Sequence, residues 1–214
     1  MRSGYTHVSM LLDRSGSMAS IKNDTIGGVN QFIEIQKKEP GKMTFTLCQF
    51  DNVYETVYDT RPVAEISNLT DQTYIPRGST ALLDSACQLI IDTGKKLDAM
   101  SEENRPERVM VVIITDGEEN ASQEQTKKSL GDMVKHQEEV YKWQFIYIGA
   151  NQDSFAEGAK IGMHGVNYEA SSGGTAAMYA AVTKNVSANR KAAPNEKRSL
   201  SQKDIDEELR KLMH

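Results

Sequence analysis

Asp13, Ser15 and Ser17 are three oxygen-bearing side chains that stand at alternate positions after an apolar run. The run "VSMLL" at 8–12 is typical of a buried strand, so the three side chains lie where that strand gives way to a loop. Carboxylate and hydroxyl oxygens in this rhythm can bind a hard divalent cation, or they can cap the helix that follows. The motif is short and built from common residues, so the rest of the chain decides its meaning.

Two further segments carry residues of the same chemical kind. "RGSTALLD" at 77–84 places Thr80 where a glycine-containing loop enters a helical stripe, and "VVIITDGEEN" at 111–120 ends an apolar strand on Asp116. The carboxyl ends of parallel strands open onto one edge of a sheet, where ligands bind. We therefore expect one site formed by Asp13, Ser15, Ser17, Thr80 and Asp116.

This set would offer two carboxylates and three hydroxyls, without imidazole or thiolate. Hard oxygen donors favour Mg²⁺, Mn²⁺ or Ca²⁺, and a set of this size suits a small octahedral ion, so we expect a divalent cation with Mg²⁺ first. Because neutral hydroxyls are weak donors, the metal would stay electron-poor and would favour an anionic oxygen from outside the protein. The four histidines lack metal-ligand spacing.

Strands and helices that alternate along the chain would position these residues. Strand-like runs occur at 7–12, 43–50, 53–59, 108–116 and 143–149, with a short run around 165–168. Helical spacing of apolar residues occurs at 18–32, 83–97, 130–137, 155–161 and 175–186. Asp51-Asn52 favours a hairpin, and a strand-to-helix turn is expected at Asn151. We predict a Rossmann-like, doubly wound α/β fold, whose mostly parallel sheet has about six strands, one antiparallel edge strand and helices on both faces.

Length and composition predict one globular domain at 1–189, followed by a polar tail at 190–214. The tail ends in a short helical pattern capped near Ser201, which either packs on the domain or awaits a partner. A net charge of −5 gives no reason to expect nucleic-acid or membrane binding. No apolar segment resembles a secretory signal or a membrane span, and Cys48 and Cys87 favour buried free thiols, so we expect a cytoplasmic protein.

The three motifs together resemble a von Willebrand factor type A domain: D-x-S-x-S after a first strand, a G-x-T loop, and a strand that ends in T-D-G. The similarity in strand and helix order covers roughly residues 5–188. The family's metal-ion-dependent adhesion site is matched without substitution at Asp13, Ser15, Ser17, Thr80 and Asp116. In the residues around these motifs, "DRSGSM…GSTALLD…ITDGEEN", the chain resembles intracellular bacterial and phage members of the family more closely than secreted adhesion proteins.

The resemblance implies a role for each residue. The hydroxyls of Ser15, Ser17 and Thr80 would bind the metal directly. Asp13 and Asp116 would hold bound water and orient the hydroxyls, with direct coordination by one of them left open. An Asp or Glu carboxylate from a partner protein would complete the metal shell. The implied function is a metal-dependent protein–protein interaction module, an adaptor or assembly subunit, and not an enzyme.

Five residues are expected to ring the site and to set partner choice by charge, or else to be ordinary solvated loop residues. They are Arg14, Arg77, Glu118, Glu119 and Asn120. Asp84, one helical turn after Thr80, is expected to make a hydrogen bond rather than bind the metal.

Two other classes of function stay open. The first is a Mg²⁺-dependent phosphotransferase-type hydrolase, in which a strand-end aspartate attacks phosphorus. Such sites carry a second acid two residues on, where this chain has Ser15. The second is a structural α/β subunit whose metal site is silent.

Overall fold

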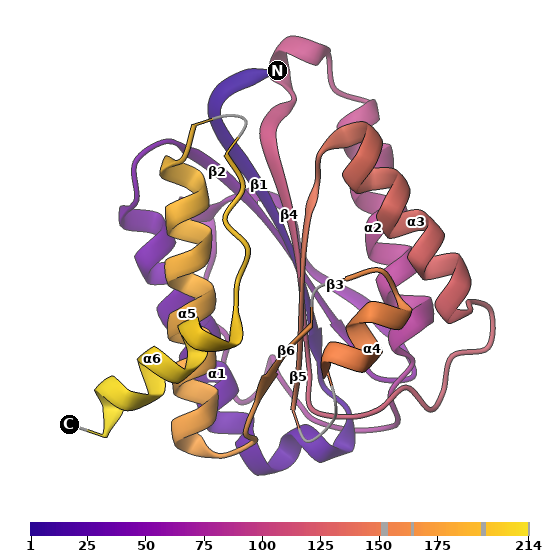
Figure 1. The fold of residues 1–214 in the computed structure, drawn as a ribbon, viewed down its shortest axis with the longest axis vertical. Coiled ribbons are helices and arrows are strands. Elements are labelled where there is room, and N and C mark those ends of the chain that lie inside the picture. Colours follow the sequence, from indigo (N-terminus) through magenta and orange to yellow (C-terminus); the bar gives the residue numbers. More distant parts are fainter. Residues whose placement is uncertain (151–153, 164, 194–195, 214) are drawn as a thin grey trace.

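Six strands form one sheet in the order β3-β2-β1-β4-β5-β6 (Figure 1). The computed structural model describes residues 1–150, 154–163, 165–193 and 196–213. The strands are β1 (Arg2–Asp13), β2 (Lys42–Phe50), β3 (Tyr54–Pro62), β4 (Pro106–Thr115), β5 (Gln144–Ala150) and β6 (Gly165–Tyr168). The helices are α1 (Lys22–Lys38), α2 (Leu82–Asp98), α3 (Lys127–Tyr141), α4 (Ser154–Lys160), α5 (Ser172–Lys191) and α6 (Gln202–Leu212). Short 3₁₀ helices are η1 (Gly16–Ile21), η2 (Val63–Glu65) and η3 (Glu102–Asn104).

The predicted fold class is confirmed. β2 and β3 pair antiparallel through the expected hairpin, which leaves β3 at an edge. All other neighbouring strands pair parallel. α1 and α5 cover one face of the sheet, and α2 and α3 cover the other (Figure 1). Parallel strands need crossover connections, and the helices between them supply these while burying both faces.

Several boundaries differ from the sequence prediction. The chain after β1 enters a 3₁₀ helix, η1, before the regular turns of α1. The last long helix, α5, begins earlier than the apolar spacing indicated, because the Ser171 side chain accepts a hydrogen bond from the Gly174 backbone N–H at 3.2 Å. The turn expected at Asn151 lies outside the described residues.

Alternation along β1 divides the core into two layers. Val8, Met10 and Leu12 pack among side chains of α1 and α5, whereas Leu11 packs among those of α2 and α3. α1 and α5 approach closely at Gly28, where an added Cβ would lie 2.1 Å from the Tyr179 ring. The central strand is therefore fixed from both faces, and its carboxyl end at Asp13 is held in place.

A buried polar chain runs between β1, β2 and α2. His7 Nδ1 lies 2.9 Å from Thr44 Oγ1, and His7 Nε2 lies 2.9 Å from Ser9 Oγ. Ser9 Oγ in turn lies 2.9 Å from Thr93 Oγ1 on α2. Burial, with the charge of Lys96 adding to it, lowers the pKa of His7 from 6.5 to about 4. His7 is thus a neutral structural residue and not a metal ligand.

This depressed pKa predicts an acid-sensitive fold. Between pH 6.5 and 4 the unfolded chain binds a proton at His7 that the folded chain does not, so stability is full above pH 6.5 and falls as the pH drops towards 4. His7→Gln removes the titration. We expect the wild type to lose roughly 2 kcal/mol more unfolding free energy than the variant between pH 7 and 4.5. Urea denaturation at the two pH values measures this, and equal losses in both proteins would contradict it.

The C-terminal segment packs on the domain, which decides between the two alternatives left open for it. Leu200 and Ile205 are 2% and 3% exposed and belong to the core layer of α1 and α5. The Gln202 side chain exchanges two hydrogen bonds of 3.0 Å with the backbone of Asn167, so it covers part of the free edge of β6. Ser201 caps α6 as predicted, with Asp204 completing the capping box.

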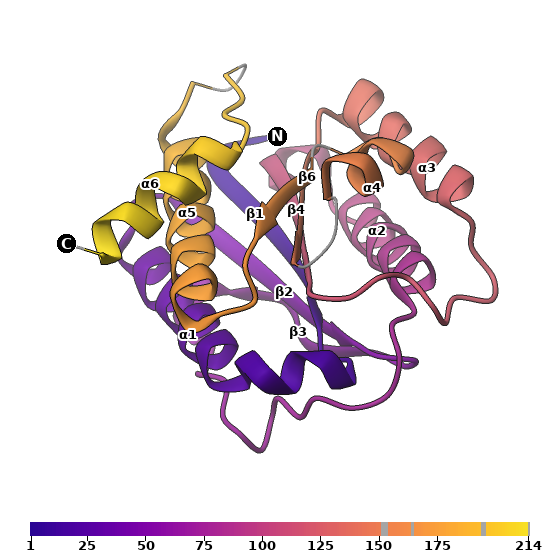
Figure 2. The same cartoon turned by 60° about the horizontal axis from the view of Figure 1, so that its bottom comes forward.

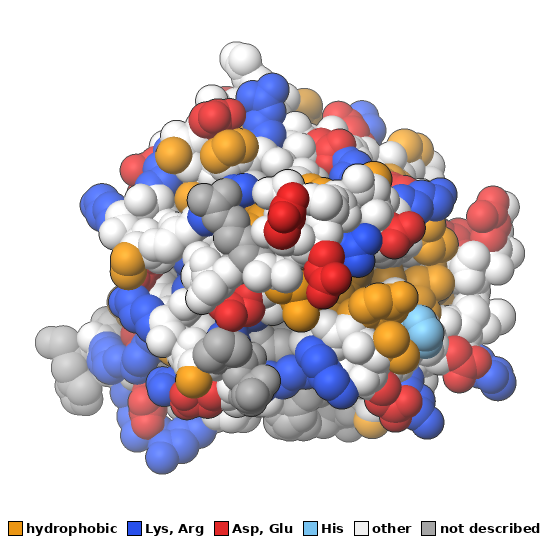
Figure 3. Space-filling view, turned by 90° about the horizontal axis from the view of Figure 1, so that it is seen from above, with side chains coloured by type: hydrophobic (Ala, Val, Ile, Leu, Met, Phe, Trp, Pro, Cys, Tyr) orange, Lys and Arg blue, Asp and Glu red, His pale blue; other side chains and the backbone are white. Residues whose placement is uncertain are grey.

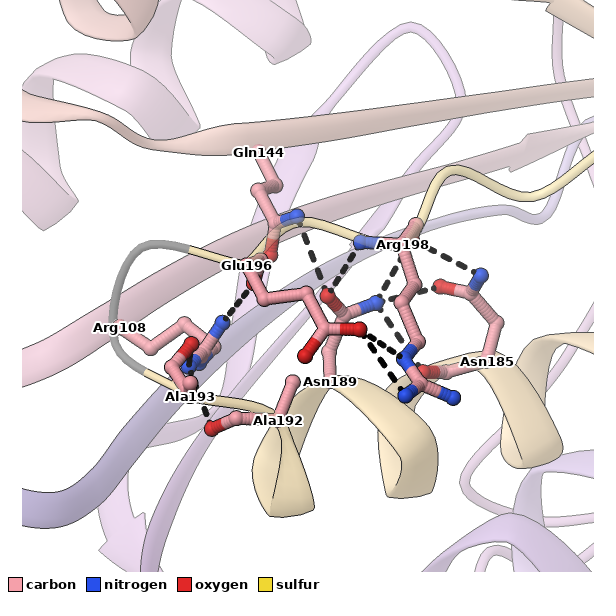
Figure 4. A network of polar contacts seen from close by, with 8 residues as sticks. All are labelled: Arg108, Gln144, Asn185, Asn189, Ala192, Ala193, Glu196 and Arg198. Carbon is pink, nitrogen blue, oxygen red and sulfur yellow. Dashed lines mark hydrogen bonds and ion pairs between the residues drawn. The ribbon is translucent and has the colours of Figure 1, made fainter.

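Buried polar side chains fix the path of this segment over the sheet (Figure 4). Arg108 of β4 donates to the carbonyl oxygens of Ala192, Ala193 and Glu196 at 2.8–3.1 Å. Asn189 of α5 donates to the Arg198 carbonyl at 2.7 Å and accepts from the Arg198 backbone N–H at 3.0 Å. These bonds satisfy the carbonyl of Ala192, the C-cap of α5, and carbonyls of the irregular segment that follows it.

Candidate metal centre

The three predicted loops meet at the carboxyl edge of the sheet, which Figure 2 brings forward. Asp13 is the last residue of β1, Ser15 is the N-cap of η1, and Ser17 lies in the first turn of η1. Thr80 precedes α2, and Asp116 follows β4. Because β1 lies between β2 and β4, its loop is central among the three.

Four of the five predicted side chains lie close together. Ser15 Oγ lies 3.1 Å from Ser17 Oγ, and Ser17 Oγ donates to Asp116 Oδ1 at 2.6 Å. A Cβ added to Gly117 would lie 3.4 Å from Thr80 Oγ1 and 3.5 Å from Ser17 Oγ, so both hydroxyls border the open side of this glycine. The structure therefore brings together oxygens that are distant in the sequence.

The fifth side chain, Asp13, forms the floor of the site and is fully buried. Its Oδ1 accepts from the Ser15 backbone N–H at 2.6 Å, and its Oδ2 accepts from Thr115 Oγ1 at 2.5 Å. The Tyr74 hydroxyl donates to the Asp13 carbonyl oxygen at 2.6 Å. Asp13 thus orients the Ser15 loop directly.

Both carboxylates lie in a desolvated position. Burial raises the pKa of Asp13 to about 6, although hydrogen bonds from Thr115 and Ser15 oppose the shift. Burial also raises the pKa of Asp116, against the hydrogen bond from Ser17. A cation at this point would stabilise both ionised forms.

The donor set fits a small octahedral ion. Adjacent oxygens around Mg²⁺ lie about 3 Å apart when each metal–oxygen bond is about 2.1 Å. The separation of the Ser15 and Ser17 hydroxyls, 3.1 Å, matches that spacing. No cluster of three or more His, Cys, Asp or Glu side chains that could hold a metal occurs in the described part of the chain, so the hydroxyl-rich set is the candidate centre.

Thr80 is held in place by the loop after β4. Its backbone N–H donates to Asn120 Oδ1 at 2.9 Å, and its carbonyl oxygen accepts from the Asn120 and Ala121 backbone N–H groups at 3.1 and 3.2 Å. Asn120 was predicted as a rim residue, and its side-chain oxygen is used in positioning Thr80. The loops that carry Thr80 and Asp116 therefore form one unit.

Glu119 and Asp84 bind the same loop to the start of α2. Glu119 accepts from the backbone N–H groups of Leu83, Ala121 and Ser122 and from the Ser122 hydroxyl, at 2.7–2.9 Å. Asp84 accepts from three successive backbone N–H groups at 123–125, so it makes hydrogen bonds, as expected. A carboxylate at a helix N-terminus also interacts favourably with the helix dipole.

Replacing Glu119 by alanine is expected to loosen the metal loops. Four donors would lose their acceptor, which should lower the unfolding free energy by about 1–3 kcal/mol and weaken Mg²⁺ binding several-fold. The adjacent Glu118→Ala is the matched control, because Glu118 is exposed. Urea denaturation and calorimetric Mg²⁺ titration of both variants provide the test. Equal effects of the two substitutions would reject the positioning role.

The remaining rim residues divide into a buried and an exposed group. Arg14 is 5% exposed and donates to Asp51 Oδ2 at 3.1 Å and to Glu55 Oε2 at 2.6 Å, so it stabilises the loops from beneath rather than facing a partner. Arg77 and Glu118 are exposed. Figure 3 shows the end of the molecule opposite the candidate metal centre, where charged side chains of both signs are interspersed.

Three residues of the site were not identified from the sequence. Thr115 belongs to the T-D-G motif, so its proximity to Asp116 was a usable signal. Tyr74 lies in an irregular segment and carried no signal. Asp51 was interpreted only as part of a hairpin turn, yet it is 1% exposed and accepts hydrogen bonds from both Arg14 and Arg77.

Comparisons with known proteins identify the fold. No family model and no curated protein matches the sequence. Among solved structures, the vWF domain of the pili tip protein Mfa5 from Porphyromonas gingivalis superimposes with a TM-score of 0.61 at 10% identity, covering 88% of this chain and 97% of that one. A von Willebrand factor type A protein from Catenulispora acidiphila gives a TM-score of 0.55 at 14% identity, covering 87% of this chain and 42% of that one.

A third similar structure contains a metal. Proximal thread matrix protein 1 from the mussel byssus, solved with a zinc-occupied MIDAS motif, gives a TM-score of 0.57 at 14% identity. The comparison covers 86% of this chain and 46% of that one. Our chain therefore spans less than half the length of the mussel and Catenulispora proteins.

The chain has the von Willebrand factor type A fold. This confirms the resemblance inferred from the three loop motifs at the level of the fold, since identities of 10–14% establish the fold alone. Across the described residues no helix combines the length and apolarity needed to cross a bilayer.

Proposed function

We propose that this chain is a metal-dependent protein–protein interaction module, an adaptor or assembly subunit that binds a partner's Asp or Glu carboxylate through a divalent cation. The observation that carries the proposal is the convergence of three oxygens at the carboxyl edge of the sheet, where Ser17 Oγ lies 3.1 Å from Ser15 Oγ and 2.6 Å from Asp116 Oδ1. The zinc in the MIDAS motif of the mussel protein supports a metal at the equivalent edge of this fold.

Of the five site residues, three would bind the cation and two would position the ligands around it. The hydroxyls of Ser15, Ser17 and Thr80 would ligate the cation, with Mg²⁺ the expected ion and Mn²⁺ or Ca²⁺ as alternatives. Asp13 and Asp116 would supply negative charge and hold metal-bound water. Such a metal keeps a position for one anionic oxygen from outside, which a protein carboxylate supplies.

A binding role is favoured over hydrolysis by the state of Asp13. Asp13 is fully buried and both of its carboxylate oxygens accept short hydrogen bonds from within the chain, whereas a phosphorus-attacking nucleophile must be accessible to its substrate. We therefore propose that the chain is not an enzyme. Turnover of a generic phosphate monoester that is abolished by Asp13→Asn would support the hydrolase instead.

The cellular setting is part of the proposal. Cys48 and Cys87 are both buried and unpaired, which supports a reducing compartment such as the cytoplasm. We propose no nucleic-acid or membrane partner, because the net charge is −5.

Selection of displayed random peptides on the Mg²⁺-loaded chain tests the function. We expect peptides that share an Asp or Glu, that are released by a chelator, and that are not captured by a folded Ser15→Ala variant. Replacing the shared acid by its amide should abolish capture. A silent structural subunit would give no chelator-sensitive peptides.

A further inference from the structure

Arg77 is an exposed, positively charged residue beside the candidate metal centre. Its backbone N–H donates to the Arg14 carbonyl oxygen at 2.7 Å, and Arg14 directly precedes Ser15. The next residue, Gly78, accepts from the Gly16 backbone N–H at 3.2 Å. Arg77 also precedes Thr80 by three residues. Its side chain therefore leaves the backbone between two of the metal-binding loops.

One end of the Arg77 guanidinium is anchored. Nε donates to Asp51 Oδ2 at 2.8 Å. Asp51 is itself fixed, because it is 1% exposed and also accepts from Arg14 Nε at 3.1 Å and from the Val53 backbone N–H at 2.6 Å. A planar guanidinium held by a buried carboxylate has a set orientation, so little freedom is lost when it binds a second group.

The other end of the guanidinium is available. The Arg77 side chain is 57% exposed, and within the described residues its two Nη groups have no acceptor. Nearby, Arg14 Nη2 is buried without an acceptor. Unused N–H donors therefore remain on this side of the rim, and a guanidinium fork matches a carboxylate in two parallel hydrogen bonds.

The two sides of the metal centre differ in the free hydrogen-bonding groups that they offer. Asp51, which anchors Arg77, follows β2, whereas Glu118 follows β4, and β1 lies between these strands. On the β2 side Arg14 and Arg77 are matched in charge by Asp51 and the exposed Glu55, so what this side offers a partner is the unused Nη edge of Arg77. A second acid on a partner would accept hydrogen bonds from that edge, whereas the exposed Glu118 on the β4 side offers it no donor.

We propose that Arg77 selects partners that carry two carboxylates, one for the metal and a second, on a nearby residue, for the free edge of the Arg77 guanidinium. This inference rests on the proposed metal-dependent binding function. It names the partner as an acidic segment with paired acids, and it assigns Arg77 as the residue that determines specificity.

Peptide selection on charge-reversal variants provides the test. A displayed random peptide library is selected on the Mg²⁺-loaded wild type, on Arg77→Glu and on Arg61→Glu. Arg61 is an exposed residue of β3 paired with Phe45 near the start of β2, so it makes the same charge change at the opposite edge of the sheet. We expect the wild type and Arg61→Glu to enrich peptides with two acids. Arg77→Glu should enrich peptides with one acid and a Lys or Arg in place of the second.

Two synthetic peptides, a selected two-acid peptide and its one-acid counterpart, are then used to measure how much Arg77 contributes to affinity. Arg77→Gln should weaken a two-acid peptide roughly tenfold and leave its one-acid counterpart unchanged, as measured by fluorescence anisotropy in Mg²⁺. Chelator-sensitive peptides without a second acid, or equal weakening of both peptides, would overturn the role of Arg77 and leave the proposed function standing. Absence of any chelator-sensitive peptide would reject both.

Discussion

Replacement of Ser17 by alanine is expected to abolish measurable Mg²⁺ binding and to leave the chain folded. The Ser17 hydroxyl is the central oxygen of the site, because it contacts both Ser15 Oγ at 3.1 Å and Asp116 Oδ1 at 2.6 Å. Its loss would remove a metal ligand and release the Asp116 carboxylate from its orienting donor. Losing a directly bound ligand should cost more than the 10–100-fold in affinity seen for outer-shell residues.

Ser20→Ala is the matched control for this substitution. Ser20 is exposed on the same 3₁₀ helix, and its hydroxyl donates to the Ser17 carbonyl oxygen at 3.2 Å. Calorimetric titration of Mg²⁺ and Mn²⁺ into both variants, with circular dichroism to verify folding, gives the comparison. Binding by Ser17→Ala that equals binding by Ser20→Ala would place the metal elsewhere.

Asp51→Asn is expected to lower the unfolding free energy by about 3 kcal/mol. Asp51 is a buried carboxylate that accepts from Arg14 and Arg77, and Arg14 is itself 5% exposed. Removing one partner of a buried ion pair leaves an uncompensated charge in a desolvated position, which costs roughly 3–5 kcal/mol. The value falls at the lower end because Glu55 remains beside Arg14.

Glu55→Gln is the control for Asp51→Asn. Glu55 also pairs with Arg14, at 2.6 Å, but its side chain is 55% exposed, so its removal should cost less than about 1 kcal/mol. Urea denaturation of the two variants measures the difference. Similar losses in both would mean that Asp51 behaves as a surface acid. Asp51→Asn should also reduce the selection of paired acids, because it releases the anchored end of Arg77.

Much of the fold followed from local patterns in the sequence. The runs at 108–116 and 143–149 are apolar without alternation, as strands buried on both faces must be, and they correspond to β4 and β5. Element ends were less predictable. Helix α5 begins before its apolar residues because the Ser171 side chain caps its N-terminus. The chain after β1 forms a 3₁₀ helix, in which the Met18 backbone N–H donates to the Ser15 carbonyl oxygen. The spacing of apolar residues does not predict local hydrogen bonds of this kind.

The sequence by itself predicted a set of oxygens for a metal site and determined which strand ends carry them. The rule that parallel strands open onto one edge was enough to place Asp13, Ser17 and Asp116 together. Only the tertiary structure decided the roles of the surrounding charges. Arg14 and Arg77 look alike in the sequence, yet Arg14 is buried against Asp51 and Glu55, whereas Arg77 keeps a free guanidinium edge. The reason is physical: the solvation of a charge depends on the groups packed around it, and those groups come from distant parts of the chain.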